Sequence, residues 1–135
     1  LTLKPHVSRQ FLGLYAVCIL TAWWASSAPP AVVGKVQAAL LVAPGDVEQA
    51  DLRQHLPGWA PIARQRLPFA AVVVGSQNDP YCRLERAQQL AADWGAQWVD
   101  AGAAGHINSA SQLGDWPQGH ALLQDLVKDS VHGKR

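Results

Sequence analysis

The 135-residue sequence contains no methionine, not even at position 1, and only two cysteines, Cys18 and Cys82. Two cysteines cannot build a disulfide framework, and their separation matches no metal-binding spacing. We therefore expect no metal or other cofactor, and a reducing, cytoplasmic setting. The missing methionine leads us to expect a fragment or a processed product.

Charge is also scarce, because only 16% of the residues are charged and the formal net charge is +1. Lysine and arginine are scattered along the chain, whereas a nucleic-acid surface needs clustered basic residues. We therefore expect no nucleic-acid partner. Hydrophobic residues make up 49% of the chain, which predicts a compact fold of one ordinary domain rather than disorder.

The longest apolar stretch, residues 11–25, is shorter than the roughly 20 residues that a membrane span needs, so no membrane association is expected. Basic residues before it and small residues after it also resemble a secretory signal. The alternative is a buried helix over 18–27, with Trp23 and Trp24 at or near its packing face. We favour the buried helix, because the apolar run that follows is typical of the next strand of a sheet.

Three apolar runs bounded by proline, glycine or polar residues predict strands at 36–44, 69–76 and 97–101. The first two are typical of strands buried on both faces. Helical patterns predict helices over 48–56, 80–95 and from Pro117 through Val127, with an irregular loop over 57–68. This alternation predicts an α/β fold, a parallel sheet flanked by helices on both faces, with ligands bound beyond the carboxyl ends of the strands.

Two polar motifs follow successive predicted strands: SQNDPY at 76–81, which contains Asp79, and GAAGHIN at 102–108, which contains His106. An acid followed by a histidine matches the last two members of a Ser–Asp–His triad. In such a triad the histidine takes the proton of the nucleophile, and the acid holds the other ring nitrogen. Two alternatives remain open: Asp79 caps a helix starting near Pro80, and His106 is a solvated loop residue.

At these motifs the sequence resembles a known family. The stretch 72–119, with NDPY, GHIN and GDWP in this order, is similar to small serine hydrolases of the YdeN and retinoblastoma-binding-protein type, within the α/β-hydrolase superfamily. The likeness extends through CILTAWWAS and ALLVAPGDVE. It implies a partial α/β-hydrolase fold whose N-terminal strands are missing, with Asp79 as the triad acid and His106 as the base. It also implies hydrolysis of small-molecule esters or amides through a serine acyl-enzyme.

The sequence departs from this family where the family has its nucleophile elbow, G-x-S-x-G. Here the segment is GLYAV, with Tyr15 at the serine position and Val17 at the second glycine. Cys18 lies three positions further on, inside the predicted helix, with its sulfur expected to point away from the elbow. The activity of this chain is therefore in question, and the alternative is a non-catalytic binding protein that keeps the pocket around His106.

The resemblance also divides the chain. Residues 1–17 are expected to be a divergent or disrupted segment, 18–130 the C-terminal part of one α/β-hydrolase domain, and 131–135 a tail. A sheet without its upstream strands exposes an edge that invites pairing with another chain. We therefore expect self-association through this edge and low solubility.

Overall fold

The computed structural model describes residues 17–131, so the expectations for Tyr15 and the rest of 1–16 lie outside the described residues. The described elements are, in order, α2 (Val17–Ser27), α3 (Pro30–Val33), β1 (Ala38–Val42), α4 (Ala50–His55), β2 (Ala70–Gly75), α5 (Leu84–Asp93), β3 (Gln97–Asp100), the 3-10 helix η1 (Ser109–Ser111) and α6 (Pro117–Val131). The alternation of strands and helices predicted from the sequence is confirmed, while α3 and η1 are additional short turns of helix.

The three strands form one parallel sheet in the order β1-β2-β3. Val72 in the central strand lies opposite Leu40 of β1 and Gln97 of β3, which fixes the register on both sides. Because the strands are parallel, their carboxyl ends lie at the same edge of the sheet. The loops that contain Asp79 and His106 both begin at that edge.

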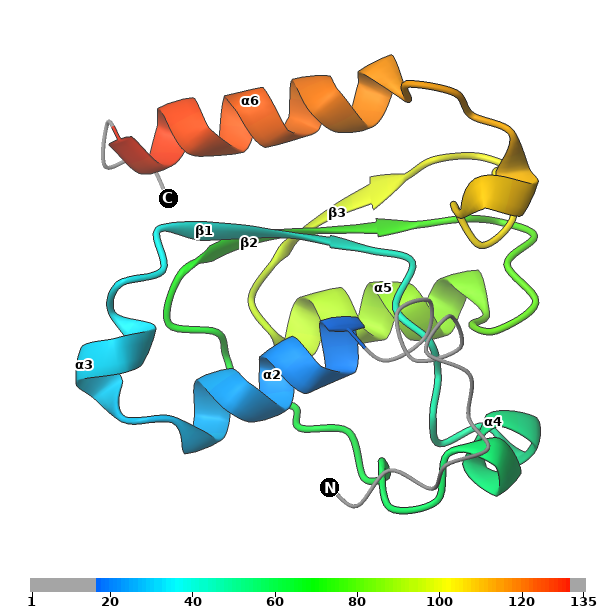
Figure 1. Ribbon diagram of the computed structural model, residues 1–135, viewed down its shortest axis with the longest axis horizontal. Coiled ribbons are helices and arrows are strands. Elements are labelled where there is room, and N and C mark those ends of the chain that lie inside the picture. Colours follow the sequence, from blue (N-terminus) through cyan, green and yellow to red (C-terminus); the bar gives the residue numbers. More distant parts are fainter. Residues whose placement is uncertain (1–16, 132–135) are drawn as a thin grey trace.

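Helices cover both faces of the sheet (Figure 1), as the alternation predicts: α2 and α5 lie on one face and α6 on the other. The larger apolar cluster joins residues of α2 and α5 to strand residues such as Leu41 and Val73. The smaller cluster places Leu126 of α6 against Val72 and Val74. Alternate residues of β2 thus point into the two clusters, as the pleat of a strand requires.

The strands differ in how completely they are buried. Residues 71–75 of β2 are all buried, as the valine-rich run predicts. In β1 only Leu41 is buried. The other residues are half-buried, although the strand packs against the clusters on both faces, so the prediction of a strand buried on both faces is confirmed only in part. The reason is position: among the described strands β1 lies at the edge of the sheet, with β2 on one side only.

The helix predicted from Pro80 begins four residues later, at Leu84. Residues 80–83 form a turn instead, in which the amide of Tyr81 donates a hydrogen bond to Asp79 Oδ1 (2.9 Å). The N-cap residue of α5 is Arg83, and it makes no side-chain capping bond. Asp79 is therefore not the cap of this helix. The face of α5 predicted to be buried is buried except at Leu84, which is half-buried: Ala87, Leu90, Ala91 and Trp94.

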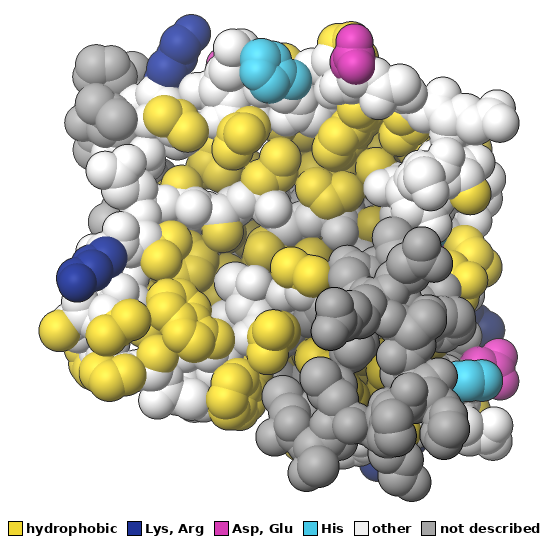
Figure 2. All heavy atoms as spheres, viewed as in Figure 1, with side chains coloured by type: hydrophobic (Ala, Val, Ile, Leu, Met, Phe, Trp, Pro, Cys, Tyr) yellow, Lys and Arg dark blue, Asp and Glu magenta, His cyan; other side chains and the backbone are white. Residues whose placement is uncertain are grey.

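Helix α2 is packed against the sheet rather than standing apart from the fold. Cys18, Ile19 and Ala22 are buried, and Trp24 packs partly against the same cluster. Trp23 differs from the prediction, because its side chain is 51% exposed. Hydrophobic side chains are visible on the outer face over α2 and α3 (Figure 2). Within residues 17–131 no helix is long and apolar enough to cross a membrane.

An ion-pair network ties the loop after β1 to α5 and to the irregular 57–68 loop. Glu48 Oε1 accepts from both Arg64 (2.6 Å) and Arg86, and Arg64 also pairs with Asp93 (2.8 Å). The amide of Asp46, beside this network, donates to the carbonyl oxygen of Tyr81 (2.9 Å). The network therefore braces the loop that carries Asp79.

Candidate active site

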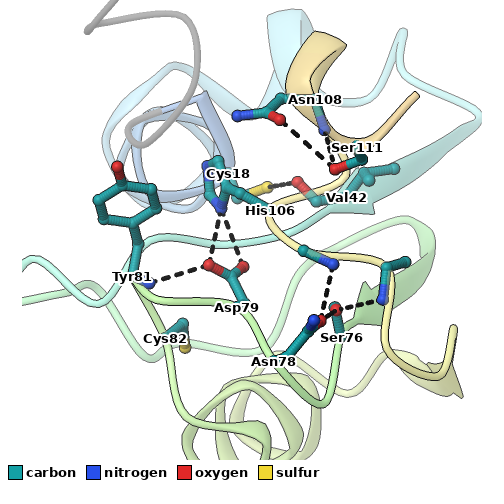
Figure 3. Close-up of polar contacts among 12 residues, drawn as sticks. Cys18, Val42, Ser76, Asn78, Asp79, Tyr81, Cys82, His106, Asn108 and Ser111 are labelled. Atoms are coloured by element: carbon teal, nitrogen blue, oxygen red, sulfur yellow. Dashed lines mark hydrogen bonds and ion pairs between the residues drawn. The ribbon is translucent and has the colours of Figure 1, made fainter. Parts of the chain in front are cut away.

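Asp79 and His106 meet at the carboxyl edge of the sheet, on loops that follow β2 and β3 (Figure 3). The Nδ1 atom of His106 lies 2.8 Å from Asp79 Oδ2 and 3.0 Å from Oδ1. Both side chains are almost fully buried, at 3% exposure for His106 and 2% for Asp79. The structure thus brings together the two site residues that the sequence singles out, and His106 is not a solvated loop residue.

The contacts of this pair fix which ring nitrogen carries a proton. An ionised carboxylate only accepts hydrogen bonds, so Nδ1 must donate, which leaves the proton-accepting role to Nε2. The amide of Tyr81 stabilises the carboxylate from the other side, and the Tyr81 ring meets the His106 ring edge to face, with centroids 4.9 Å apart. Carboxylate and imidazole are therefore held in one orientation.

Ser76 and Asn78 hold the loop after β2 and the loop after β3 together, a role that the sequence does not reveal. Ser76 Oγ accepts from the amide of Ala104 (2.9 Å) and donates to Asn78 Oδ1 (3.1 Å), while the same Oδ1 accepts from the amide of Gly105 (2.7 Å). Both residues lie in the SQNDPY motif, and the sequence feature that could have indicated their role is the run of polar side chains directly after a strand. They fasten the histidine loop to the aspartate loop.

We expect Ser76→Ala to loosen the histidine loop. Ser76 is buried, and its removal leaves the amide of Ala104 without its acceptor, so the free energy of unfolding should fall by about 1–3 kcal/mol. Chemical denaturation measures this loss, and Ser109→Ala, the same exchange at an exposed serine of the histidine loop, is the matched control. Equal stability of Ser76→Ala and the parent chain would show that Ser76 does not hold the histidine loop in place.

A cavity of about 440 Å³ lies beside the pair, and its lining includes Tyr81, Gly105, His106, Asn108 and Leu113. Its wall combines backbone, aromatic and amide groups, which suits a small ligand with an oxygen acceptor. No group of three or more potential metal ligands lies together in the described part of the chain.

Neither cysteine is placed to act as the nucleophile. The Cys18 thiol is buried and donates to the carbonyl oxygen of Val42 (3.4 Å), and burial raises its pKa to about 12. Burial also raises the pKa of Cys82 to about 12, helped by the negative charges of Asp46 and Asp79. A thiol is a good nucleophile only as thiolate, so both side chains are inert near neutral pH.

Consequently, we expect a disulfide reagent such as DTNB to label neither thiol of the folded protein at pH 8. Both thiols should react once the chain is unfolded in guanidinium, where the pKa returns to the ordinary value of about 8.5. Absorbance of the released thionitrobenzoate counts the reactive thiols. Rapid labelling of Cys18 in the folded state would contradict its burial.

An open parallel sheet between helix layers, with an aspartate–histidine pair beyond successive strand ends, defines the class of α/β hydrolases. Residues 14–125 match the family described as Serine hydrolase. Because this match covers most of the chain, the protein belongs to the serine hydrolase family.

The comparison with solved structures agrees. The crystal structure of a YdeN-like hydrolase from Pectobacterium atrosepticum superposes with a TM-score of 0.66 at 25% sequence identity. The likeness covers 87% of this chain and 56% of the other, so the chain spans little more than half the length of that hydrolase. No curated protein matches the sequence. The fold is therefore part of the α/β-hydrolase fold, as the resemblance implies.

Proposed function

We propose that this protein acts in the hydrolysis of small-molecule esters or amides by acyl transfer, with His106 as the general base and Asp79 as the acid that orients it. The observation that carries the proposal is the buried contact of His106 Nδ1 with both carboxylate oxygens of Asp79. Membership of the serine hydrolase family supports the same chemistry.

The reaction would proceed as in other triads. A hydroxyl nucleophile attacks the carbonyl carbon while His106 Nε2 takes its proton, and the ring later returns that proton to the leaving group. Asp79 stays ionised and stabilises the imidazolium that forms between these two steps. Burial of both side chains strengthens this interaction, because the low dielectric of the interior screens it less than water does.

The nucleophile is the part of this proposal that depends on the resemblance. Tyr15 occupies the serine position of the elbow, outside the described residues, and Val17 replaces a glycine. Tyrosine has an ordinary pKa of about 10 and a bulky ring, and nothing in the elbow sequence favours it as a nucleophile. We therefore propose that turnover by this chain is weak, the alternative being a binding protein without catalysis.

A fluorophosphonate probe separates these possibilities, since labelling forms a phosphorus–oxygen bond, expels fluoride and passes the hydroxyl proton to His106. We compare the parent chain with Tyr15→Ser/Val17→Gly, with and without His106→Ala. Val17 is more than half exposed, so its replacement removes little packing. Labelling that rises in the double variant and disappears with His106→Ala supports the proposal. Folded protein that is never labelled favours the binding protein.

We also propose that a second copy pairs along the edge of β1 that no strand within residues 17–131 covers. The amide of Ala43 donates to Val74, and because bonding directions alternate in parallel strands, the amides of Leu40 and Val42 face away from β2. Sedimentation at rising protein concentration tests this pairing, and a monomer at every concentration would contradict it.

The two free thiols support a reducing, cytoplasmic setting.

A further inference from the structure

Asn108 lies two residues after His106 and lines the same cavity. Its side-chain amide is held at one end only. Oδ1 accepts hydrogen bonds from the amide of Ala110 (3.1 Å) and from Ser111 Oγ (3.4 Å), while the backbone amide of Asn108 donates to Ser111 Oγ (3.2 Å). These bonds form a capping box at the start of η1. They tie Asn108 firmly to its own loop.

The capping box also decides which way the amide group faces. A backbone amide can only donate, so the atom that meets Ala110 must be the oxygen, and the nitrogen Nδ2 must point the opposite way. No hydrogen bond from Nδ2 is found within residues 17–131. In Figure 3 the nitrogen points away from Ser111, toward the side on which His106 lies. An oriented donor therefore remains available at the cavity.

The backbone at Ile107, between His106 and Asn108, is strained. Ile107 has a φ of 50°, a left-handed conformation that is unfavourable for a β-branched residue. Such strain costs on the order of 1–3 kcal/mol and persists where the surroundings impose it, commonly at ligand-binding sites. Here it forms the tight turn between His106 and Asn108, whose side chains both line one cavity.

We propose that Asn108 is a substrate-binding residue, whose Nδ2 donates a hydrogen bond to an oxygen of the ester or amide held beside His106. This inference rests on the proposed function, and it identifies the side chain that recognises the substrate in the same site. The donor is fixed before the substrate arrives, so little side-chain entropy is lost on binding. The ligand class is a small acyl compound whose oxygen accepts one hydrogen bond.

The test uses acetanilide, an amide stable to hydrolysis, as the probe, and follows the imidazole resonances of His106 and the side-chain amide resonances of Asn108 by NMR. Asn108→Ser and Asn108→Asp both keep an N-cap oxygen, so the 3-10 helix is retained, while each removes the Nδ2 donor. In both variants we expect the dissociation constant of acetanilide to rise about threefold to tenfold, the effect of one lost hydrogen bond. In the parent chain the Asn108 amide resonances should shift on saturation.

The outcomes are distinguishable. Equal affinity of the parent chain and both variants, with unshifted Asn108 resonances, would leave Asn108 as a helix cap only and overturn the inference while the acyl-binding site stands. If acetanilide leaves the His106 resonances of the parent chain unchanged, the acyl-binding site itself fails and the role of Asn108 fails with it. Gln112→Ala, at an exposed residue just beyond η1, controls for general disturbance of the loop.

Discussion

Asp79→Asn is expected to abolish ester hydrolysis that passes through His106, with a loss of about 10⁴-fold or down to the uncatalysed background. An asparagine amide donates to Nδ1, which forces the ring proton onto Nε2, the nitrogen that should accept the proton of the nucleophile. Release of nitrophenolate from p-nitrophenyl acetate measures the rate, and the elbow variant Tyr15→Ser/Val17→Gly provides the more active background.

The control for this prediction is His106→Ala, which should lower the rate to the same level, because the two residues act as one unit. Asp100→Asn is a matched exchange at an exposed aspartate of the same sheet edge. Its side chain accepts from Gln77 and from the amide of Gly102, bonds that hold its pKa below the ordinary value, and it does not contact His106. A rate that survives Asp79→Asn would contradict the assigned role.

Trp94→Ala should produce the largest loss of stability, about 3–5 kcal/mol in the free energy of unfolding. Trp94 follows α5 and is fully buried, with 0% exposure, in the larger cluster. Its Nε1 also donates to the carbonyl oxygen of Ala63 (2.8 Å), which fastens the irregular 57–68 loop to the end of α5. Such a loss is a large share of the roughly 5–15 kcal/mol that stabilises a typical domain.

Urea denaturation gives the size of this effect, with two comparison variants. Trp94→Phe keeps a buried aromatic ring but removes the pyrrole part of the indole together with its N–H donor, so it should cost about 1–3 kcal/mol, less than Trp94→Ala. Trp23→Ala exchanges a tryptophan that is 51% exposed and should cost much less than Trp94→Ala. Equal losses at Trp23 and Trp94 would show that the packing described around α5 is wrong.

The sequence predicts the fold well where burial is strong. The valine-rich run of β2 and the helical spacing of Ala87, Leu90 and Trp94 each identify a single element, because both patterns reflect the faces that are buried. The aspartate–histidine pair follows from topology, since parallel strands bring their carboxyl ends to one edge. Sequence position alone therefore predicts that Asp79 and His106 lie close together.

What the sequence does not predict depends on side-chain geometry. Helix α5 begins after residues 80–83, because these residues form a turn in which the amide of Tyr81 donates a hydrogen bond to Asp79. The spacing of apolar residues does not reveal this turn. An apolar stretch also does not show which of two adjacent tryptophans is better buried, and the side chain of Trp23 is 51% exposed. The clamp made by Ser76 and Asn78 joins residues 27 or more positions apart, so only the folded loops display it.

The central claim is that Asp79 holds the buried His106 ring with its proton on Nδ1. A long-range ¹H–¹⁵N spectrum of the imidazole in alkaline buffer tests it directly and needs no nucleophile. We predict one neutral tautomer, protonated at Nδ1, which changes to the Nε2 tautomer in Asp79→Asn. A ring protonated at Nε2 in the parent chain, or a mixture of tautomers unaffected by Asp79→Asn, would contradict the claim.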